Sequence, residues 1–261
     1  MATDELLFEK SGAKASIVFN RPSVHNAMNW AMYDRLEAVC DEIDADDDIR
    51  VVTLSGAGGK AFVAGTDIGQ FQDFESGDDA VAYEQRIDRV VSRLEHLKRP
   101  TIAMIQGVCV GGGAAIALAC DFRYADDNLK LGIPIAKTLG NCLSMANFAR
   151  LVDLLGTPKA KEMLMLARLF KAEECKAAGV VNDIFAADTI EAEVDAIADR
   201  LTQMAPLTVA ATKAAIQRIH EARRIAPEDG EDLIRSCYTS DDFHGAVDAF
   251  MEKRQYAWQG R

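Results

Sequence analysis

Two glycine turns are the stretches of this chain that could carry out chemistry. "KAFVAGTDIGQF" occupies 60–71 and "GVCVGGGAA" occupies 107–115. Each follows a strand-like pattern and precedes a helical one, so the first N–H groups of the helix are free to bind an anion. Gly111 and Gly113 fit the start of a dinucleotide fingerprint, but Ile116 stands where its third glycine is needed. A repeated turn of this kind favours a paired anion or oxyanion site, and close helix–sheet packing is the alternative.

Charge and composition exclude several classes of partner and cofactor. The 261-residue chain carries 41 acidic and 29 basic side chains, a net charge of −12, which argues against nucleic acid or an anionic membrane as its partner. The four histidines lack metal-ligand spacing, so we expect no metal site. The six cysteines form no CxxC pair, and we interpret them as reduced, mostly buried thiols of a cytoplasmic protein.

The N-terminal stretch and the hydropathy pattern agree with that location. "MATDELLFEKSGAKASIVF" is acidic and has no basic segment followed by an apolar one, so it does not resemble a secretory signal. No apolar run reaches the roughly eighteen residues of a membrane span.

Short strands alternate with amphipathic helices in the first part of the chain. Strands are predicted at 15–20, 51–56, 100–107 and 122–125. One helix is predicted after Asn29, which can cap it, and a second over about 80–97 with Glu84 facing outward. A further helix follows the second glycine turn. This alternation indicates crossover connections and a largely parallel α/β sheet.

The chain becomes predominantly helical beyond Pro158. "PKAKEMLMLARLF", "KAEECKAAG", "TIEAEVDAIADRLTQMA" and "LTVAATKAAIQRIHEARR" all have helical patterns, and Gly179 is placed to end the second of them. Helices rich in small residues, such as "VAATKAAIQRI", fit the interior of a domain or a contact with another subunit, and the sequence favours neither.

Together these motifs make the sequence resemble the crotonase (enoyl-CoA hydratase/isomerase) superfamily over nearly its whole length. "NRPSVHNAMN" resembles the family's N-terminal segment, and "KAFVAGTDI" and "PTIAMIQGVCVGGG…ACDFRYA" resemble its two oxyanion loops. "LFKAEECKAAGVVNDIF" and the terminal "AFMEKR" are also of the family type. Each motif alone is degenerate, but five in the right order are specific.

The resemblance implies a fold, a ligand and an assembly. The fold would be a spiral of repeated ββα units with the acyl-CoA site over residues 1–200, followed by a helical region over 201–261 that serves oligomerisation and covers the CoA. The substrate would be an acyl-CoA thioester, with coenzyme A part of the substrate and no permanently bound cofactor. The resemblance also implies a homotrimer or a dimer of trimers and a role in fatty acid metabolism.

Specific residues receive roles from the same resemblance. By motif position, the N–H groups of Ala64 and Gly112 would hold the thioester carbonyl in an oxyanion hole. Val24 and His25 match positions that touch the nucleotide part of CoA. Phe250 and Lys253 match residues that reach a neighbouring subunit's CoA, where Lys253 would pair with phosphate; a solvated face of a terminal helix is the alternative for Lys253.

The chain departs from the family pattern at the two glutamates that hydratases of this family use. Ala115 stands three residues after Gly112, and Ile135 follows Pro134. Hydration needs an acid and a base, so efficient hydration is not expected. We predict isomerase, decarboxylase or thioesterase-type chemistry on a thioester enolate. A non-catalytic acyl-CoA-binding or assembly protein on the same scaffold is the alternative.

Other polar residues are candidates to replace the missing glutamates. Asn141 could hydrogen-bond a carboxylate or hold a water, and we assign it a catalytic role. Cys142 has no histidine at a motif position beside it, so a buried structural thiol is the favoured interpretation. For Asp67 we favour capping or bracing of the first glycine turn. Asp73 and Glu75 are the remaining carboxylates on the segment that borders the acyl pocket in this family.

Overall fold

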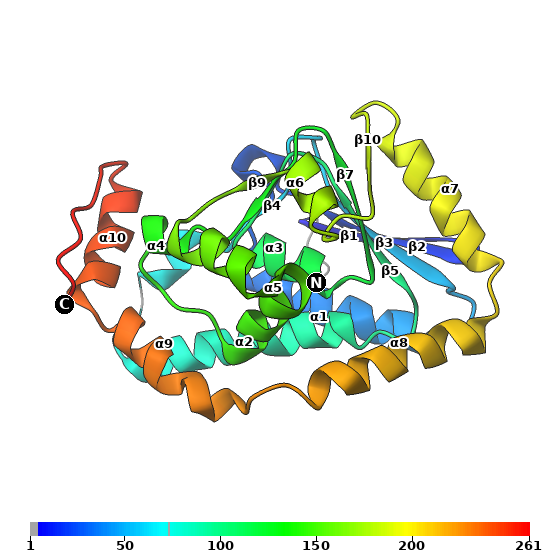
Figure 1. Cartoon of the computed structure of the whole chain (residues 1–261). Helices are drawn as coiled ribbons and strands as arrows, with labels where there is room; N and C mark the ends of the chain where they lie inside the picture. Colours follow the sequence, from blue (N-terminus) through cyan, green and yellow to red (C-terminus); the bar gives the residue numbers. More distant parts are fainter. Residues whose placement is uncertain (1–4, 73) are drawn as a thin grey trace.

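The computed structural model describes residues 5–72 and 74–261, and within them two sheets form the centre of the molecule (Figure 1). The six-stranded sheet has the order β1-β2-β3-β5-β7-β10. Its strands are β1 (Leu6–Ser11), β2 (Lys14–Phe19), β3 (Val51–Gly56), β5 (Thr101–Ile105), β7 (Phe122–Asp126) and β10 (Asp183–Phe185). Only the β1–β2 pair is antiparallel, which confirms a largely parallel sheet built through crossovers.

The four-stranded sheet has the order β4-β6-β8-β9 and carries the glycine turns. Its strands are β4 (Ala61–Ala64), β6 (Val108–Val110), β8 (Lys130–Gly132) and β9 (Phe170–Lys171). The first three run parallel, so β4 and β6 end at the same edge of the sheet. The turns after these two strands are therefore neighbours in space although the sequence separates them.

Three helices in the first half of the chain confirm the periodicity analysis. They are α1 (Trp30–Ala45), α2 (Gly77–Glu95) and α3 (Gly112–Ala119). The Asn29 side chain accepts a hydrogen bond from the N–H of Met32 and caps α1, as predicted. Ser76 and Asp79 form a reciprocal capping box at the start of α2.

The second half of the chain is mainly helical, as predicted. Its helices are α4 (Ile135–Thr138), α5 (Met145–Met165), α6 (Ala172–Ala177), α7 (Ile190–Thr202), α8 (Pro206–Glu221), α9 (Glu231–Tyr238) and α10 (Asp241–Met251). Gly179 follows α6 with φ 73°, the left-handed conformation of a helix end. Helix α5 is kinked at Gly156, two residues before Pro158. Short 3-10 helices η1 (Pro22–Val24), η2 (Ile68–Phe71) and η3 (Pro227–Gly230) complete the elements.

The C-terminal helices return to the part of the molecule that carries the glycine turns. Helix α9 packs on α2, and α10 packs on α9 and on η2, which directly follows the first glycine turn. Helices α7 and α8 form the opposite end of the molecule in Figure 1. No helix within the described residues is long and apolar enough to cross a membrane.

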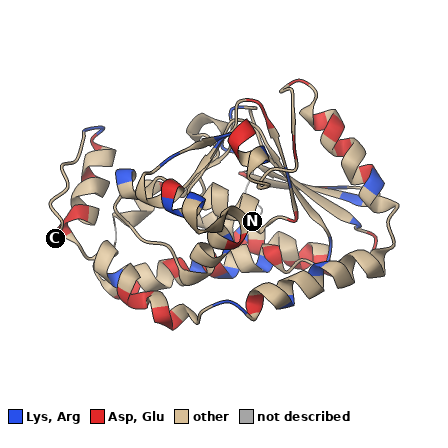
Figure 2. Ribbon diagram, in the orientation of Figure 1, with Lys and Arg blue, Asp and Glu red and all other residues tan. Residues whose placement is uncertain are grey.

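Most charged side chains lie on the surface, and a few are buried. Figure 2 shows Asp and Glu spread over α7, α9 and α10 with Lys and Arg between them. One of the buried ones is Glu84 on α2, which is only 3% exposed. The prediction that Glu84 faces outward is therefore wrong, because α9 packs on α2 and covers this carboxylate.

Candidate active site

The two glycine turns meet where β4 and β6 end. Ala64 pairs with Val110 in the parallel ladder, and the chain turns immediately afterwards at Gly65 and Gly111, both with positive φ. A Cβ on Gly111 would lie 3.4 Å from the Cα of Gly65, so the two backbones approach closely at this point. The first turn of α3 begins at Gly112 and directs its N–H groups toward this junction.

The backbone N–H groups at this junction differ in whether they are already used. The N–H of Ala64 donates to the carbonyl of His25 at 3.0 Å, so the prediction of Ala64 as an oxyanion donor is wrong. Within residues 5–72 and 74–261, the N–H groups of Thr66 and Gly112 have no acceptor. The nitrogen of Thr66 lies 3.8 Å from the position of a Cβ on Gly112, so these two free donors are neighbours.

The segment 21–28 holds the first turn in this conformation. The N–H of Met28 donates to the carbonyl of Gly65, and the N–H of Asp67 donates to the carbonyl of Met28. These two bonds lie on either side of Thr66 and leave its own N–H free. The Asp67 carboxylate accepts from the N–H of Gly69 and pairs with Arg21 at 3.2 Å, which confirms its bracing role.

Three hydroxyl groups lie directly behind the junction. Thr66 Oγ1 is 2.8 Å from the Tyr33 hydroxyl and 3.0 Å from the Tyr83 hydroxyl. A Cβ on Gly112 would lie 2.5 Å from the Tyr33 oxygen, a contact that only glycine avoids. Burial raises the pKa of both tyrosines, so they stay neutral donors and acceptors near neutral pH.

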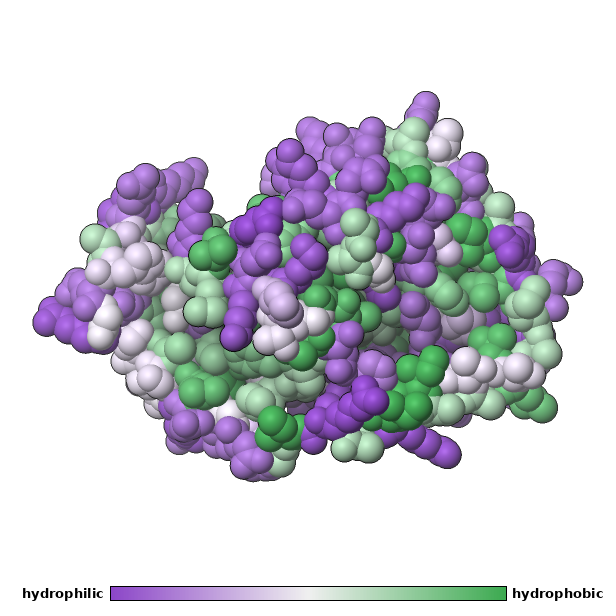
Figure 3. All heavy atoms as spheres, viewed as in Figure 1, coloured by the Kyte–Doolittle hydropathy of each residue, from purple (hydrophilic) through white to green (hydrophobic). Residues whose placement is uncertain are grey.

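An aromatic cluster forms the wall next to these hydroxyls. Tyr83 contacts Phe71, Phe74 and Tyr238, with ring centroids 5.0, 5.7 and 6.2 Å apart. Phe243 of α10 packs against Tyr238, with ring centroids 4.7 Å apart and the rings tilted by 51°. The C-terminal helices α9 and α10 thus complete this wall. Figure 3 shows a notch between the lobe that contains α10 and the rest of the molecule.

The positions of the two missing glutamates are apolar in the structure. Ala115 lies in the first turn of α3 and is 6% exposed, and Ile135 opens α4 and packs against the core. Glu75 is exposed just before α2, and Asp73 lies outside the described residues. Cys142 is buried, as predicted, and a hydrogen bond with Cys237, together with burial, raises the pKa of its thiol. A thiol of this kind is a poor nucleophile.

A buried carboxylate that the sequence analysis missed lies behind the aromatic wall. Glu84 accepts from the Tyr238 hydroxyl at 2.7 Å and from the N–H of Ser144 at 3.0 Å. Burial, reinforced by nearby Asp88, raises the pKa of Glu84 to about 8 despite these two hydrogen bonds. Asn141 joins the cluster, because its Nδ2 donates to the Tyr238 oxygen at 3.1 Å. The signal in the sequence was the spacing of Glu84, which lies four residues after Ala80 and three before Ile87 on the apolar stripe of α2.

The predicted CoA-contacting residues lie on the surface. Val24 is 43% exposed at the end of η1, and His25 follows it with a left-handed φ of 52°. His25 lies beside the first glycine turn because its carbonyl accepts from Ala64. Phe250 is 51% exposed near the end of α10, and Lys253 is exposed just beyond it. These roles remain predictions.

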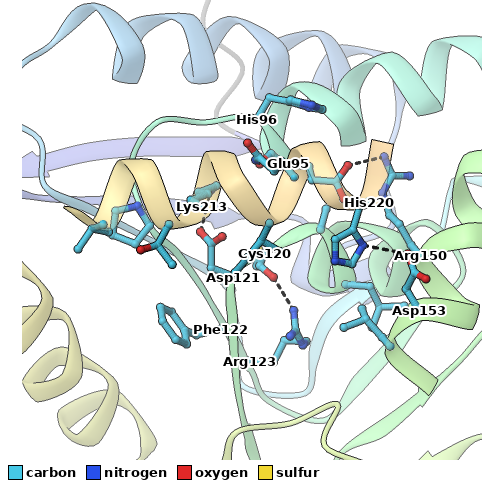
Figure 4. Close-up of a pocket in the computed structure, with 18 of the residues that line it drawn as sticks. Glu95, His96, Cys120, Asp121, Phe122, Arg123, Arg150, Asp153, Lys213 and His220 are labelled. Carbon is cyan, nitrogen blue, oxygen red and sulfur yellow. Dashed lines mark hydrogen bonds and ion pairs between the residues drawn. The ribbon is translucent and has the colours of Figure 1, made fainter. Parts of the chain in front are cut away.

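A separate cavity of about 430 Å³ lies at the other end of α3, under α8 (Figure 4). Leu118 to Arg123 line it, whereas the glycine junction lies at Gly112. Its charged groups are largely paired: Lys213 contacts Asp121 at 2.7 Å, and Glu95 joins Arg150 and Arg224. We place the candidate site at the glycine junction, where two neighbouring backbone N–H groups are free, rather than in this cavity.

Comparison with known proteins identifies the family of this chain. The model of the enoyl-CoA hydratase/isomerase family matches residues 9–261. The chain belongs to the enoyl-CoA hydratase/isomerase family. A short-chain-enoyl-CoA hydratase of Clostridium acetobutylicum is 32% identical over 260 residues, which cover 98% of this chain and 97% of that protein.

Solved structures of the family confirm the crotonase-type fold. An enoyl-CoA hydratase/carnithine racemase from Magnetospirillum magneticum superposes with a TM-score of 0.81 at 32% identity, over 99% of this chain and 97% of that one. A methylmalonyl-CoA decarboxylase in complex with 2-nitronate-propionyl-CoA has a TM-score of 0.90 over the whole of both chains, and at 23% identity it shows the shared fold only.

Proposed function

We propose that this protein binds an acyl-CoA thioester at the glycine junction and stabilises its enolate with the N–H groups of Thr66 and Gly112. The observation that carries the proposal is this pair of neighbouring amide donors, which the surrounding backbone bonds leave free. Amide donors fixed before the reaction stabilise the negative charge that develops on a thioester oxygen. Removal of one such donor costs on the order of 10²–10³ in rate.

The residues around the junction favour reactions that need no pair of glutamates. Ala115 and Ile135 offer no proton donor or acceptor, so two contributions of roughly 10²–10⁴ each are lost for hydration. Decarboxylation of a malonyl-type thioester, double-bond isomerisation and thioester hydrolysis all pass through an enolate or an oxyanion that this junction would stabilise. We infer one of these activities, with Asn141 as a polar side chain toward the acyl group.

Product analysis by mass spectrometry after incubation with enoyl-, malonyl- and aryl-CoA thioesters tests this proposal. We expect turnover of at least one of these thioesters. If the protein binds CoA ligands but turns over none of these thioesters, the hypothesis that it is an enzyme is refuted. That result would favour the alternative, a non-catalytic acyl-CoA-binding protein. Rapid hydration of crotonyl-CoA would show that other residues supply the acid and the base.

The CoA contacts can be tested separately from the chemistry. If Lys253 pairs with a phosphate of CoA, Lys253→Ala raises KM about tenfold and leaves kcat unchanged. Lys161→Ala, an exposed lysine on α5, is the matched control and should change neither. An unchanged KM in Lys253→Ala would assign this lysine to a solvated helix end.

We propose the trimer, or a dimer of trimers, as the assembly. Helix α8 leaves large apolar side chains in solvent, with Leu207 84%, Ile216 51% and Ile219 52% exposed. Exposed apolar side chains along one element mark protein interfaces. Light scattering coupled to gel filtration should give a mass of three or six chains of 28.4 kDa, and a monomer would refute this assembly.

A further inference from the structure

The carboxylate of Glu84 is tied to the loop before α5 at two places. Directly, its second oxygen accepts the N–H of Ser144, the residue that caps α5. Indirectly, its first oxygen accepts the Tyr238 hydroxyl, whose oxygen in turn accepts Nδ2 of Asn141. The three side chains come from α2, from α9 and from the loop between α4 and α5. We call Glu84, Tyr238 and Asn141 the amide relay.

Asn141 ends this relay with an unused acceptor. Its Oδ1 is buried and has no hydrogen-bond donor among the described residues. A buried carbonyl oxygen without a donor costs roughly 1–3 kcal/mol, so such an atom calls for a ligand or a water as its partner. Because Nδ2 is bonded to Tyr238 in this arrangement, the free atom of the amide is the acceptor Oδ1.

The relay adjoins the proposed oxyanion site. The ring of Tyr238 lies 6.1 Å from Phe74 and 6.2 Å from Tyr83, and the Tyr83 hydroxyl is 3.0 Å from Thr66 Oγ1. Thr66 carries one of the two free N–H groups. The aromatic wall thus connects the amide relay to the place where the thioester oxygen would lie.

The protonation state of Glu84 dictates the direction of every bond in the relay. The ionised carboxylate accepts from the Tyr238 hydroxyl, so the tyrosine oxygen accepts from Asn141 and Oδ1 faces away, as the structure shows. A protonated Glu84 donates to the tyrosine oxygen instead. The Tyr238 proton then needs an acceptor, and a rotated Asn141 amide supplies one with Oδ1 and leaves Nδ2 as the outward donor.

We propose that Glu84 is a positioning residue that, through Tyr238, decides whether Asn141 presents a hydrogen-bond donor or an acceptor to the acyl group of the substrate. This inference rests on the proposed function, because it takes the acyl group to lie beside the aromatic wall. The donor form stabilises an anionic acyl group, such as the carboxylate of a malonyl-type thioester. The acceptor form binds a hydroxyl group or a water.

The surroundings of Glu84 bring the change in its protonation state into the physiological range of pH. The groups that act on it from the packed elements are Asp88 on its own helix, the hydroxyl of Tyr238 on α9 and the N–H of Ser144. Tyr33 on α1 and Cys142 in the loop also lie within its electrostatic reach and stay neutral because their pKa values are raised. The pKa of Glu84, about 8, therefore gives mostly the donor form at neutral pH.

Nuclear magnetic resonance of the side-chain amide of Asn141 tests the relay without any substrate. We expect its signals to shift with a midpoint near the Glu84 pKa of about 8. Glu84→Gln, which imitates the protonated form, and Tyr238→Phe, which interrupts the relay, should both abolish this shift. Asp78→Asn, at an exposed position of the same helix, is the matched control and should retain it.

The outcomes separate this inference from the proposed function. The relay is refuted if the Asn141 signal does not change with pH in the folded wild type, or if it still titrates in Glu84→Gln. Either result holds whatever reaction the protein catalyses. With a turned-over thioester, kcat/KM of the wild type should change up to about tenfold per pH unit on one side of this midpoint, while Glu84→Gln gives a flat profile. If no thioester is turned over but the Asn141 signal still titrates, the proposed enzymatic function is refuted and the relay is retained.

Discussion

Replacement of Glu84 by glutamine should change how the stability of the protein depends on pH. The folded protein holds the Glu84 proton up to a pKa of about 8, whereas the unfolded chain releases it near the ordinary value of 4.5. Between these two values the folded state binds one proton more than the unfolded state. Stability contributed by this proton therefore falls as pH rises through the window. Glutamine cannot ionise, so Glu84→Gln lacks this loss.

The magnitude follows from proton linkage. One proton of difference corresponds to about 1.4 kcal/mol of unfolding free energy per pH unit. From about pH 5.5 to about pH 7.5 the wild type should lose roughly 3 kcal/mol relative to Glu84→Gln. The amide keeps the size of the carboxyl group and can still bond Tyr238 and the N–H of Ser144, so packing contributes little to this difference.

Urea unfolding followed by circular dichroism at a series of pH values measures this quantity. The contributions of all other titrating groups, which the two proteins share, cancel in the difference in unfolding free energy between wild type and Glu84→Gln. Asp78→Asn, at an exposed position of the same helix, should show no such slope. Parallel stability curves for wild type and Glu84→Gln between about pH 5 and about pH 8 would refute the interpretation that Glu84 is buried and retains its proton.

Further predictions concern the glycine junction, the missing glutamates and the cavity under α8. Gly112→Ala places a methyl group against the Tyr33 hydroxyl and should lower kcat/KM about 10²-fold, with part of the loss restored by adding Tyr33→Phe. Ala115→Glu with Ile135→Glu should raise crotonyl-CoA hydration about 10²-fold or more; no gain in a folded, CoA-binding variant would contradict the assignment of these two positions. Lys213→Met leaves its partly exposed partner Asp121 without a cation and should cost about 2 kcal/mol in urea unfolding, while an unchanged midpoint would show that the pair contributes nothing.

Local patterns in the sequence were enough to predict the elements that carry the site. The steps of three and four between apolar residues predicted α1 and α2, and Asn29 marked the start of α1, because helix periodicity and capping depend on neighbouring residues only. The two glycine turns were also visible, because a positive φ and a close backbone approach both favour glycine. Their order among the other motifs was sufficient to predict the family.

The choice of the free donor depended on tertiary contacts. Motif position pointed to Ala64, whose N–H is taken by His25, a residue about forty positions earlier in the chain. The bonds of Met28 to either side of Thr66 leave the Thr66 N–H free instead. A hydrogen bond between distant segments has no signature in the spacing of residues within either segment, so the sequence alone could not separate Ala64 from Thr66.

Residue type and local spacing were enough to predict α1 to α3, α6 to α8, the strands β2, β3, β5 and β7, the two glycine turns and the absence of the hydratase glutamates, because each of these depends on neighbouring residues. Only the tertiary structure decided the environment of Glu84. Its partner Tyr238 lies 154 residues further along the chain, on a helix that packs over α2. Helix spacing alone places Glu84 on the apolar stripe of α2, four residues after Ala80 and three before Ile87, but it does not show what covers that stripe. The packing of α9 removes water from the carboxylate, and the cost of burying its charge keeps its proton in place.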